Sequence, residues 1–78
     1  MLKYHFHIRG ENGELDRDER GVEFETLDEA HAEAVRTAIE MVLARPAHFH
    51  DDERVFEITD PDGLVLREVP FKDVFRLE

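Results

Sequence analysis

Hydrophobic and polar residues alternate strictly at the start of the chain. The apolar positions are Leu2, Tyr4, Phe6 and Ile8. The positions between them are polar and are Lys3, His5 and His7. Because successive side chains of a strand point to opposite faces, this period of two predicts a half-buried strand over residues 2–8. A shorter alternation over residues 21–25 predicts a second, short strand.

The segment between these two strands, residues 9–21, has no such period. It contains glycine, asparagine and several acidic residues, and Leu15 is its one large apolar residue. This composition predicts a loop, with at most a very short extended piece. Its acidic residues Asp16, Asp18 and Glu19 lack the spacing of an EF-hand calcium loop, so we interpret them as a solvated cluster.

A helix is predicted after the second strand. Thr26 and Glu29 form the S/T-x-x-E pattern of a capping box, in which the threonine hydroxyl accepts from the backbone N–H of Glu29. The apolar residues that follow share one broad face: Leu27, Ala30, Ala34, Val35, Ala38, Ile39, Met41, Val42 and Leu43. Pro46 disfavours helical geometry at the residue before it, so the helix should end at about residue 44.

Two further runs suited to strands follow, "RVFEIT" at 54–59 and "LVLREV" at 64–69. The Asp-Pro-Asp-Gly sequence between them predicts a hairpin, since proline presets one turn residue and glycine accepts a positive φ. The tail 70–78 keeps several apolar residues. It is expected to pack, either as a helical turn or as an extension of the strand.

The order of these elements predicts an α+β fold of the β-β-α-β-β type, in one domain over residues 1–78. Three to four antiparallel strands would form a sheet with one helix packed across a face. The opposite face would be either solvated or buried against a second copy. A symmetric homodimer is the commonest way to cover such a face, so we expect self-association.

Composition limits the classes of partner. Twenty acidic and ten basic residues give a net charge of −10, which disfavours nucleic acid, whose phosphates are bound mainly by lysine and arginine. The charge instead suits solubility, repulsion of anionic partners or attraction to a basic protein partner, and alone it selects none of these. The chain has no cysteine, no apolar run of membrane-spanning length and no recognisable signal peptide, so we expect a soluble, cytoplasmic protein without membrane association.

The tripeptide His-Phe-His occurs twice, at residues 5–7 and 48–50. In a strand, His5 and His7 would project from the same face about 7 Å apart, close enough for a shared metal ion. If His48 and His50 joined them, the four imidazoles would suit a divalent transition metal such as Zn²⁺ or Ni²⁺. The simpler interpretation, which we prefer, is that the first pair fills polar strand positions and the second lies in a solvated loop.

No catalytic or cofactor-binding residue is predicted. His31 lies between Leu27 and Val35 on the apolar side of the helix and is interpreted as a partly buried packing residue. The chain has no serine, and its three threonines are explained as a helix cap, a helix surface position and a strand position. A hydroxyl nucleophile with a histidine base is therefore not expected, and the protein is predicted not to be an enzyme.

The chain resembles a family of small bacterial proteins classed as a domain of unknown function. The shared motifs are "YHFHIRG" in the first strand, "DERG" before the short strand, "LDEA" and "AEAVR" in the helix, and the closing "DPDGLVLREVPF". The likeness covers nearly the whole chain and implies the fold and extent of the domain. Because the family has no established activity, it implies no catalytic residues.

A second resemblance is to the HicB-like antitoxins, whose T-L-x-E-A helix opening is similar to residues 26–30. It implies a protein that neutralises a toxin by binding a basic surface. Three hypotheses follow from the sequence. The first is a non-enzymatic interaction or regulatory module that acts as a homodimer, the second an antitoxin-like binder of a basic partner, and the third a histidine-based metal-binding protein.

Overall fold

A computed structural model of the chain describes residues 1–45 and 52–76. The elements in chain order are β1 (Leu2–Arg9), β2 (Leu15–Asp16), β3 (Val22–Phe24), α1 (Leu27–Leu43), β4 (Val55–Thr59), β5 (Val65–Pro70) and the 3-10 helix η2 (Phe71–Arg76). The predicted α+β class and element order are confirmed. The sheet has five strands rather than three to four, because the short extended piece expected near Leu15 pairs as β2. Residues 71–76 form a helical turn, which is the first of the two alternatives expected for the tail.

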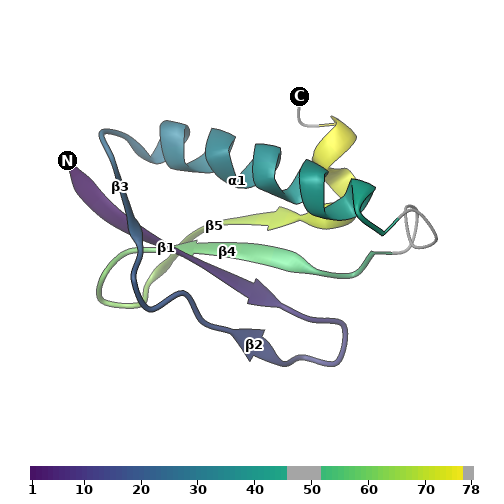
Figure 1. The fold of residues 1–78 in the computed structure, drawn as a ribbon. Helices are drawn as coiled ribbons and strands as arrows, with labels where there is room; N and C mark the ends of the chain where they lie inside the picture. The colour runs from purple at the N-terminus through teal and green to yellow at the C-terminus, as the bar shows by residue number, and fades with distance from the viewer. Residues whose placement is uncertain (46–51, 77–78) are drawn as a thin grey trace.

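The sheet is antiparallel, with the order β2-β1-β4-β5 and with β3 also paired to β1 (Figure 1). β3 pairs with β1 from Leu2 to Tyr4, and β2 pairs with it at Ile8 and Arg9. The stretch of β1 from residue 5 to 7 therefore pairs with β4 on one side and has no paired strand residue on the other. This interruption positions the candidate site.

The core lies between one face of the sheet and α1, as Figure 1 shows. Alanines form the middle of the buried helix stripe, and their small side chains bring the helix close to the sheet. Full burial of an apolar side chain such as Ile58 contributes about 1.5–3 kcal/mol. The buried core residues are Tyr4, Ala30, Ala34, Val35, Ala38, Val42, Phe56, Ile58, Val69, Phe71 and Val74.

The ends of α1 follow the predicted signals. Thr26 is extended and its hydroxyl accepts from the backbone N–H of Glu29 at 3.1 Å, so the threonine half of the capping box is confirmed. The helix ends at Leu43, with Ala44 as its C-cap, one residue before the predicted end. Within the described residues, no helix is both long enough and apolar enough to cross a membrane.

The predicted hairpin joins β4 and β5. One carboxylate oxygen of Asp60 accepts from the backbone N–H groups of Asp62 and Leu64, both at 2.9 Å. Gly63 has a φ of 91°, the left-handed region that glycine adopts without strain. The aspartate acceptor and the positive φ of the glycine therefore form the turn, and the role predicted for Gly63 is confirmed.

The face of the sheet opposite α1 carries no other element in the described part of the chain (Figure 1). We call it the open face, and strand alternation and register assign to it Lys3, His5, His7, Arg9, Val55, Glu57, Thr59 and Glu68. Arg9 pairs with the buried carboxylate of Glu57 and approaches Glu68 at 3.9 Å. The open face is thus mainly polar, and its charges are partly paired within the chain.

Candidate functional site

Asp18 lies in the connection between β2 and β3, opposite the unpaired stretch of β1. Its carboxylate accepts from the backbone N–H of Phe6 at 3.1 Å, and from those of Arg20 at 3.2 Å and Gly21 at 3.1 Å. The N–H of Phe6 would otherwise lack a partner at this edge, which is costly for a partly buried backbone group. The aspartate side chain therefore takes the place of a strand residue.

The backbone of Asp18 binds the two histidines of β1. Its N–H donates to Nδ1 of His7 at 2.9 Å, and its carbonyl accepts from Nδ1 of His5 at 2.8 Å. The two imidazole rings are stacked, with centroids 6.1 Å apart and planes 24° apart. We call the group formed by His5, Phe6, His7, Asp18 and Gly21 the Asp18 cluster.

These contacts set opposite tautomers on the two rings. A backbone N–H can only donate, so Nδ1 of His7 carries no proton and the neutral ring holds its proton on Nε2. That Nε2–H points at Oγ1 of Thr59, 3.4 Å away. A carbonyl can only accept, so Nδ1 of His5 carries the proton and its Nε2 keeps a free lone pair.

The same environment favours a neutral His7 and an ionised Asp18. Burial is the main cause that lowers the pKa of His7, repulsion from His5 and Arg17 adds to it, and attraction to Asp18 opposes it. For Asp18, burial disfavours the charged form. The N–H donors of Gly21, Phe6 and Arg20 together outweigh that effect and hold the pKa of Asp18 below its usual value.

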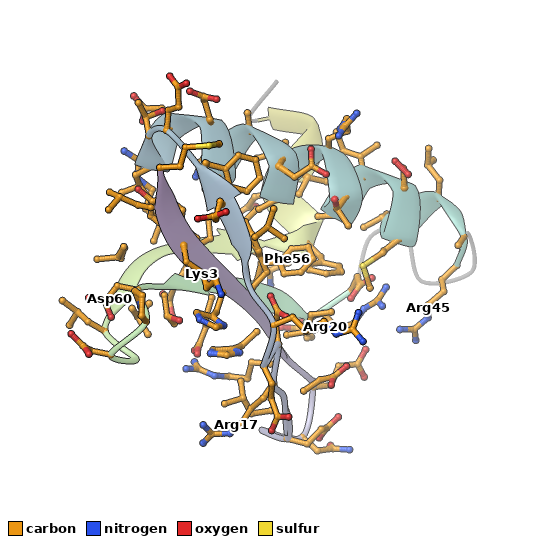
Figure 2. All side chains as sticks on the ribbon, turned by 60° about the vertical axis from the view of Figure 1, so that its left-hand side comes forward. Lys3, Arg17, Arg20, Arg45, Phe56 and Asp60 are labelled. Carbon is orange, nitrogen blue, oxygen red and sulfur yellow. The ribbon has the colours of Figure 1, made fainter. Side chains whose placement is uncertain are left out.

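A hollow of about 380 Å³ lies beside the cluster on the open face. The strands contribute His5, His7 and Thr59 to its walls, and the remaining lining residues are Arg17, Glu19, Asp60, Pro61, Asp62 and Gly63. Figure 2 shows Arg17 far from α1, at the bottom of the view, and Asp60 beside the β4–β5 turn. The hollow is therefore a polar site formed by β1, the β2–β3 connection and the β4–β5 turn.

The structure brings His5 and His7 together, as the strand period predicted. His48 and His50 lie outside the described residues, so both the preferred interpretation of that pair as part of a solvated loop and the alternative of a shared metal site stay untested. In residues 1–45 and 52–76 no group of three or more metal-ligating side chains is found. His31 is partly buried, as predicted, and its Nδ1 is buried without a hydrogen-bond partner in the described part of the chain.

The interpretation of Asp16, Asp18 and Glu19 as a solvated cluster is wrong for Asp18. Its carboxylate is partly buried and accepts three backbone hydrogen bonds. An available signal was Asp-x-x-Gly at residues 18–21, in which aspartate opens a turn and glycine closes it. Asp16 and Glu19 are exposed.

A second polar contact that the sequence pattern does not indicate joins Asp52 and Arg54. The side chain of Asp52 is 1% exposed and receives two hydrogen bonds from the Arg54 guanidinium, at 2.9 and 2.7 Å. The guanidinium carbon lies 4.7 Å from the centre of the Phe71 ring. The side-chain hydrogen bonds from Arg54 are the main cause that lowers the pKa of Asp52. This pair anchors the start of β4 to η2.

Comparison with known proteins agrees with the first resemblance. Residues 3–72 match the model of a family described as a domain of unknown function (DUF6894). Neither the curated proteins nor the solved structures gave a match. The likeness to HicB-like antitoxins receives no support from these comparisons and rests on the helix opening alone. The match spans most of the chain, which therefore belongs to the DUF6894 family of unknown function.

Proposed function

We propose that the protein is a non-enzymatic interaction module that binds a partner through the hollow on its open face. The observation that carries this proposal is the Asp18 cluster, which fixes the position and tautomer of both histidines beside the hollow. A surface already held in one arrangement loses little conformational entropy when a partner binds. Such pre-organisation is typical of recognition sites.

The tautomer of His7 supports a non-enzymatic role. Thr59 and His7 superficially resemble a hydroxyl nucleophile and its base, at 3.4 Å. A general base needs a free lone pair facing the hydroxyl, whereas Nε2 of His7 carries a proton there. Thr59 is also only 2% exposed, which keeps its hydroxyl away from a substrate. The Thr59–His7 contact therefore favours a structural role over a catalytic one.

The same hydrogen bonds disfavour a metal centre built on the first histidine pair. Metal ions bind the lone pair of a neutral imidazole nitrogen. His5 offers Nε2, but both nitrogens of His7 are engaged, one as an acceptor and one as a protonated donor. We therefore place the metal-binding hypothesis behind the interaction module.

The chemistry around the hollow favours a basic protein segment as partner. Nε2 of His5 is a free acceptor, and Glu19 and Asp62 add exposed carboxylates to the walls. Among the described residues that line the hollow, Arg17 is the one cationic side chain. A chain of net charge −10 also attracts basic surfaces over a distance. The antitoxin-like hypothesis also expects a basic protein partner. It rests on the helix opening at residues 26–30, whereas the present proposal rests on the hollow.

The homodimer stays a prediction, and the open face does not favour it. A second copy on that face would bury the charges of Arg9 and Glu68, and burying charges costs free energy unless they are fully paired. Size-exclusion chromatography with light scattering tests the prediction. A mass near that of one 9.2 kDa chain at high micromolar concentration would contradict it.

The binding proposal is tested by NMR titration with a short peptide rich in lysine and arginine. We expect amide shift changes to concentrate at residues 17–19 and 59–63. A matched pair of double variants controls for net charge: Glu19→Gln with Asp62→Asn in the hollow, and Glu25→Gln with Glu40→Gln elsewhere on the surface. The first pair should weaken binding clearly more than the second. Equal weakening, or shift changes centred on α1, would overturn the proposal.

A further inference from the structure

We propose that protonation of His7 releases the segment 17–21 from β1. When the ring takes up a second proton, the hydrogen bond from the N–H of Asp18 is lost and the segment opens from β1 more often. The proposal rests on the geometry of the Asp18 cluster. It does not require that the hollow bind a partner.

Protonation of His7 is incompatible with its main contact. A protonated imidazole carries hydrogen on both nitrogens, so Nδ1–H would face the N–H of Asp18 across a distance of 2.9 Å. Two donors cannot share that contact. His5 differs, because a second proton would go to its free Nε2 and leave its bond to the Asp18 carbonyl intact. His7 is thus the sensitive member of the pair.

The groups that face His7 come from every element packed around it. On β1 these are His5 and Arg9, and on the β2–β3 connection they are Arg17, Asp18 and Glu19. From β4 and its turn they are Glu57, Thr59, Asp60 and Asp62. Glu57 is paired with Arg9, and Asp60 is occupied by the N–H groups of its own turn.

Burial is the main cause that lowers the pKa of His7 below its ordinary value of 6.5, and repulsion from His5 and Arg17 adds to it against the attraction of Asp18. The folded protein therefore binds this proton less readily than the unfolded chain does. Stability from a neutral His7 is complete above about pH 6.5 and is lost as the pH falls from there toward the lower folded pKa. Asp18, whose own pKa lies below its usual value, remains ionised in this range.

Besides the bond to His7, the segment is held to β1 by the N–H of Phe6, which donates to the Asp18 carboxylate, and by Nδ1 of His5, which donates to the Asp18 carbonyl. β2 is two residues long with both side chains exposed, and β3 is three residues long. Segments with little buried apolar surface open locally at low free-energy cost. Opening would also move Arg17 and Glu19 away from the hollow. A partner bound there would then be lost, and this consequence alone rests on the proposed function.

Amide hydrogen exchange and imidazole ¹⁵N NMR test the release in the intact protein without a partner. At about pH 7.5, Nδ1 of His7 should show the shift of an unprotonated nitrogen. Between about pH 7.5 and pH 5, exchange at Phe6, Asp18 and Gly21 should accelerate about tenfold or more beyond the intrinsic change, while Ile58 stays protected. A protonated Nδ1 at the higher pH, or no local acceleration, would overturn the proposal.

Two variants separate the release from general acid destabilisation. In His7→Asn the amide oxygen can replace Nδ1 as acceptor and does not titrate, so the pH-dependent acceleration should disappear. His31→Asn is the control and should keep it. Acceleration that persists in His7→Asn would assign the effect to another group and refute the role of His7. Because no partner is involved, that failure would leave the binding proposal standing on its own test.

Discussion

Phe6 donates its backbone N–H to the carboxylate of Asp18 at 3.1 Å, so a side chain pairs with β1 at the place where no strand does. The pairing is reciprocal, because the backbone carbonyl and N–H of Asp18 form hydrogen bonds with the side chains of His5 and His7 on β1. A single residue thereby joins the segment between β2 and β3 to the centre of the sheet. Its removal should affect stability more than its position in a loop suggests.

Asp18→Ala should lower the free energy of unfolding by about 2–3 kcal/mol, because three backbone donors lose a charged acceptor. Asp18→Asn should cost less, since its amide oxygen can still accept. Urea denaturation at neutral pH measures both values. Glu19→Ala, a change at an exposed neighbouring carboxylate, is the control and should stay within about 0.5 kcal/mol of wild type. Equal losses at the two positions would refute the special role of Asp18.

Asp52→Asn should lower the free energy of unfolding by about 2–3 kcal/mol at pH 7, because Arg54 loses its charged, bidentate acceptor. The folded pKa of Asp52 lies below 3.8, so its stabilising effect is complete above that value and is lost as the pH falls below it. The gap between variant and wild type should therefore shrink in acid. Denaturant titrations from neutral to acidic pH measure this gap, and Asp62→Asn, which should show almost none, is the control.

Gly21 and Gly63 allow a matched comparison, because both have a positive φ, 70° and 91°. A Cβ at Gly63 meets no atom within 4 Å, whereas one at Gly21 would lie 2.8 Å from Cγ of Lys3. Gly63→Ala should cost about 1–2 kcal/mol from backbone strain alone. Gly21→Ala should cost clearly more, since steric overlap is added. Thermal denaturation gives the order, and a larger loss at Gly63 would contradict it.

Thr26→Ala should destabilise the protein by about 1 kcal/mol, because the first turn of α1 loses the acceptor for the N–H of Glu29. Thr26→Ser keeps a hydroxyl in that position and should recover most of the loss. Thr37→Ala, at a partly buried position within the same helix, is the comparison and should have a smaller effect because it removes no cap. Equal effects of the two alanine variants on the free energy of unfolding would argue against a capping role.

Local patterns predicted most of the fold. The alternation in β1, the cap at Thr26 and the turn at Asp60 are each specified by neighbouring residues, and each forms as expected. The conformation of the tail could not be decided, because apolar residues such as Phe71 and Val74 suit either a helical turn or a strand. Contact with α1 and the end of β5 selects the 3-10 helix.

The candidate site was less predictable because it depends on pairs that are distant in sequence. Strand period placed His5 and His7 on one face, but nothing local indicated that the backbone of Asp18 would reach both rings. Their tautomers follow from that contact alone. Asp52 is a similar case, since its acidic neighbours suggested an exposed loop, whereas it is buried and paired with Arg54, which in turn lies against the Phe71 ring.

The interrupted pairing of β1 also affects how the protein meets other copies of itself. An unprotected sheet edge offers a continuous row of backbone groups to which a strand of another molecule can add, and this is a route to aggregation. Along this side β1 is screened by β3 over three residues and β2 over two, with the Asp18 carboxylate between them. An incoming strand would meet only short, broken pieces, so this edge resists fibril growth by its geometry.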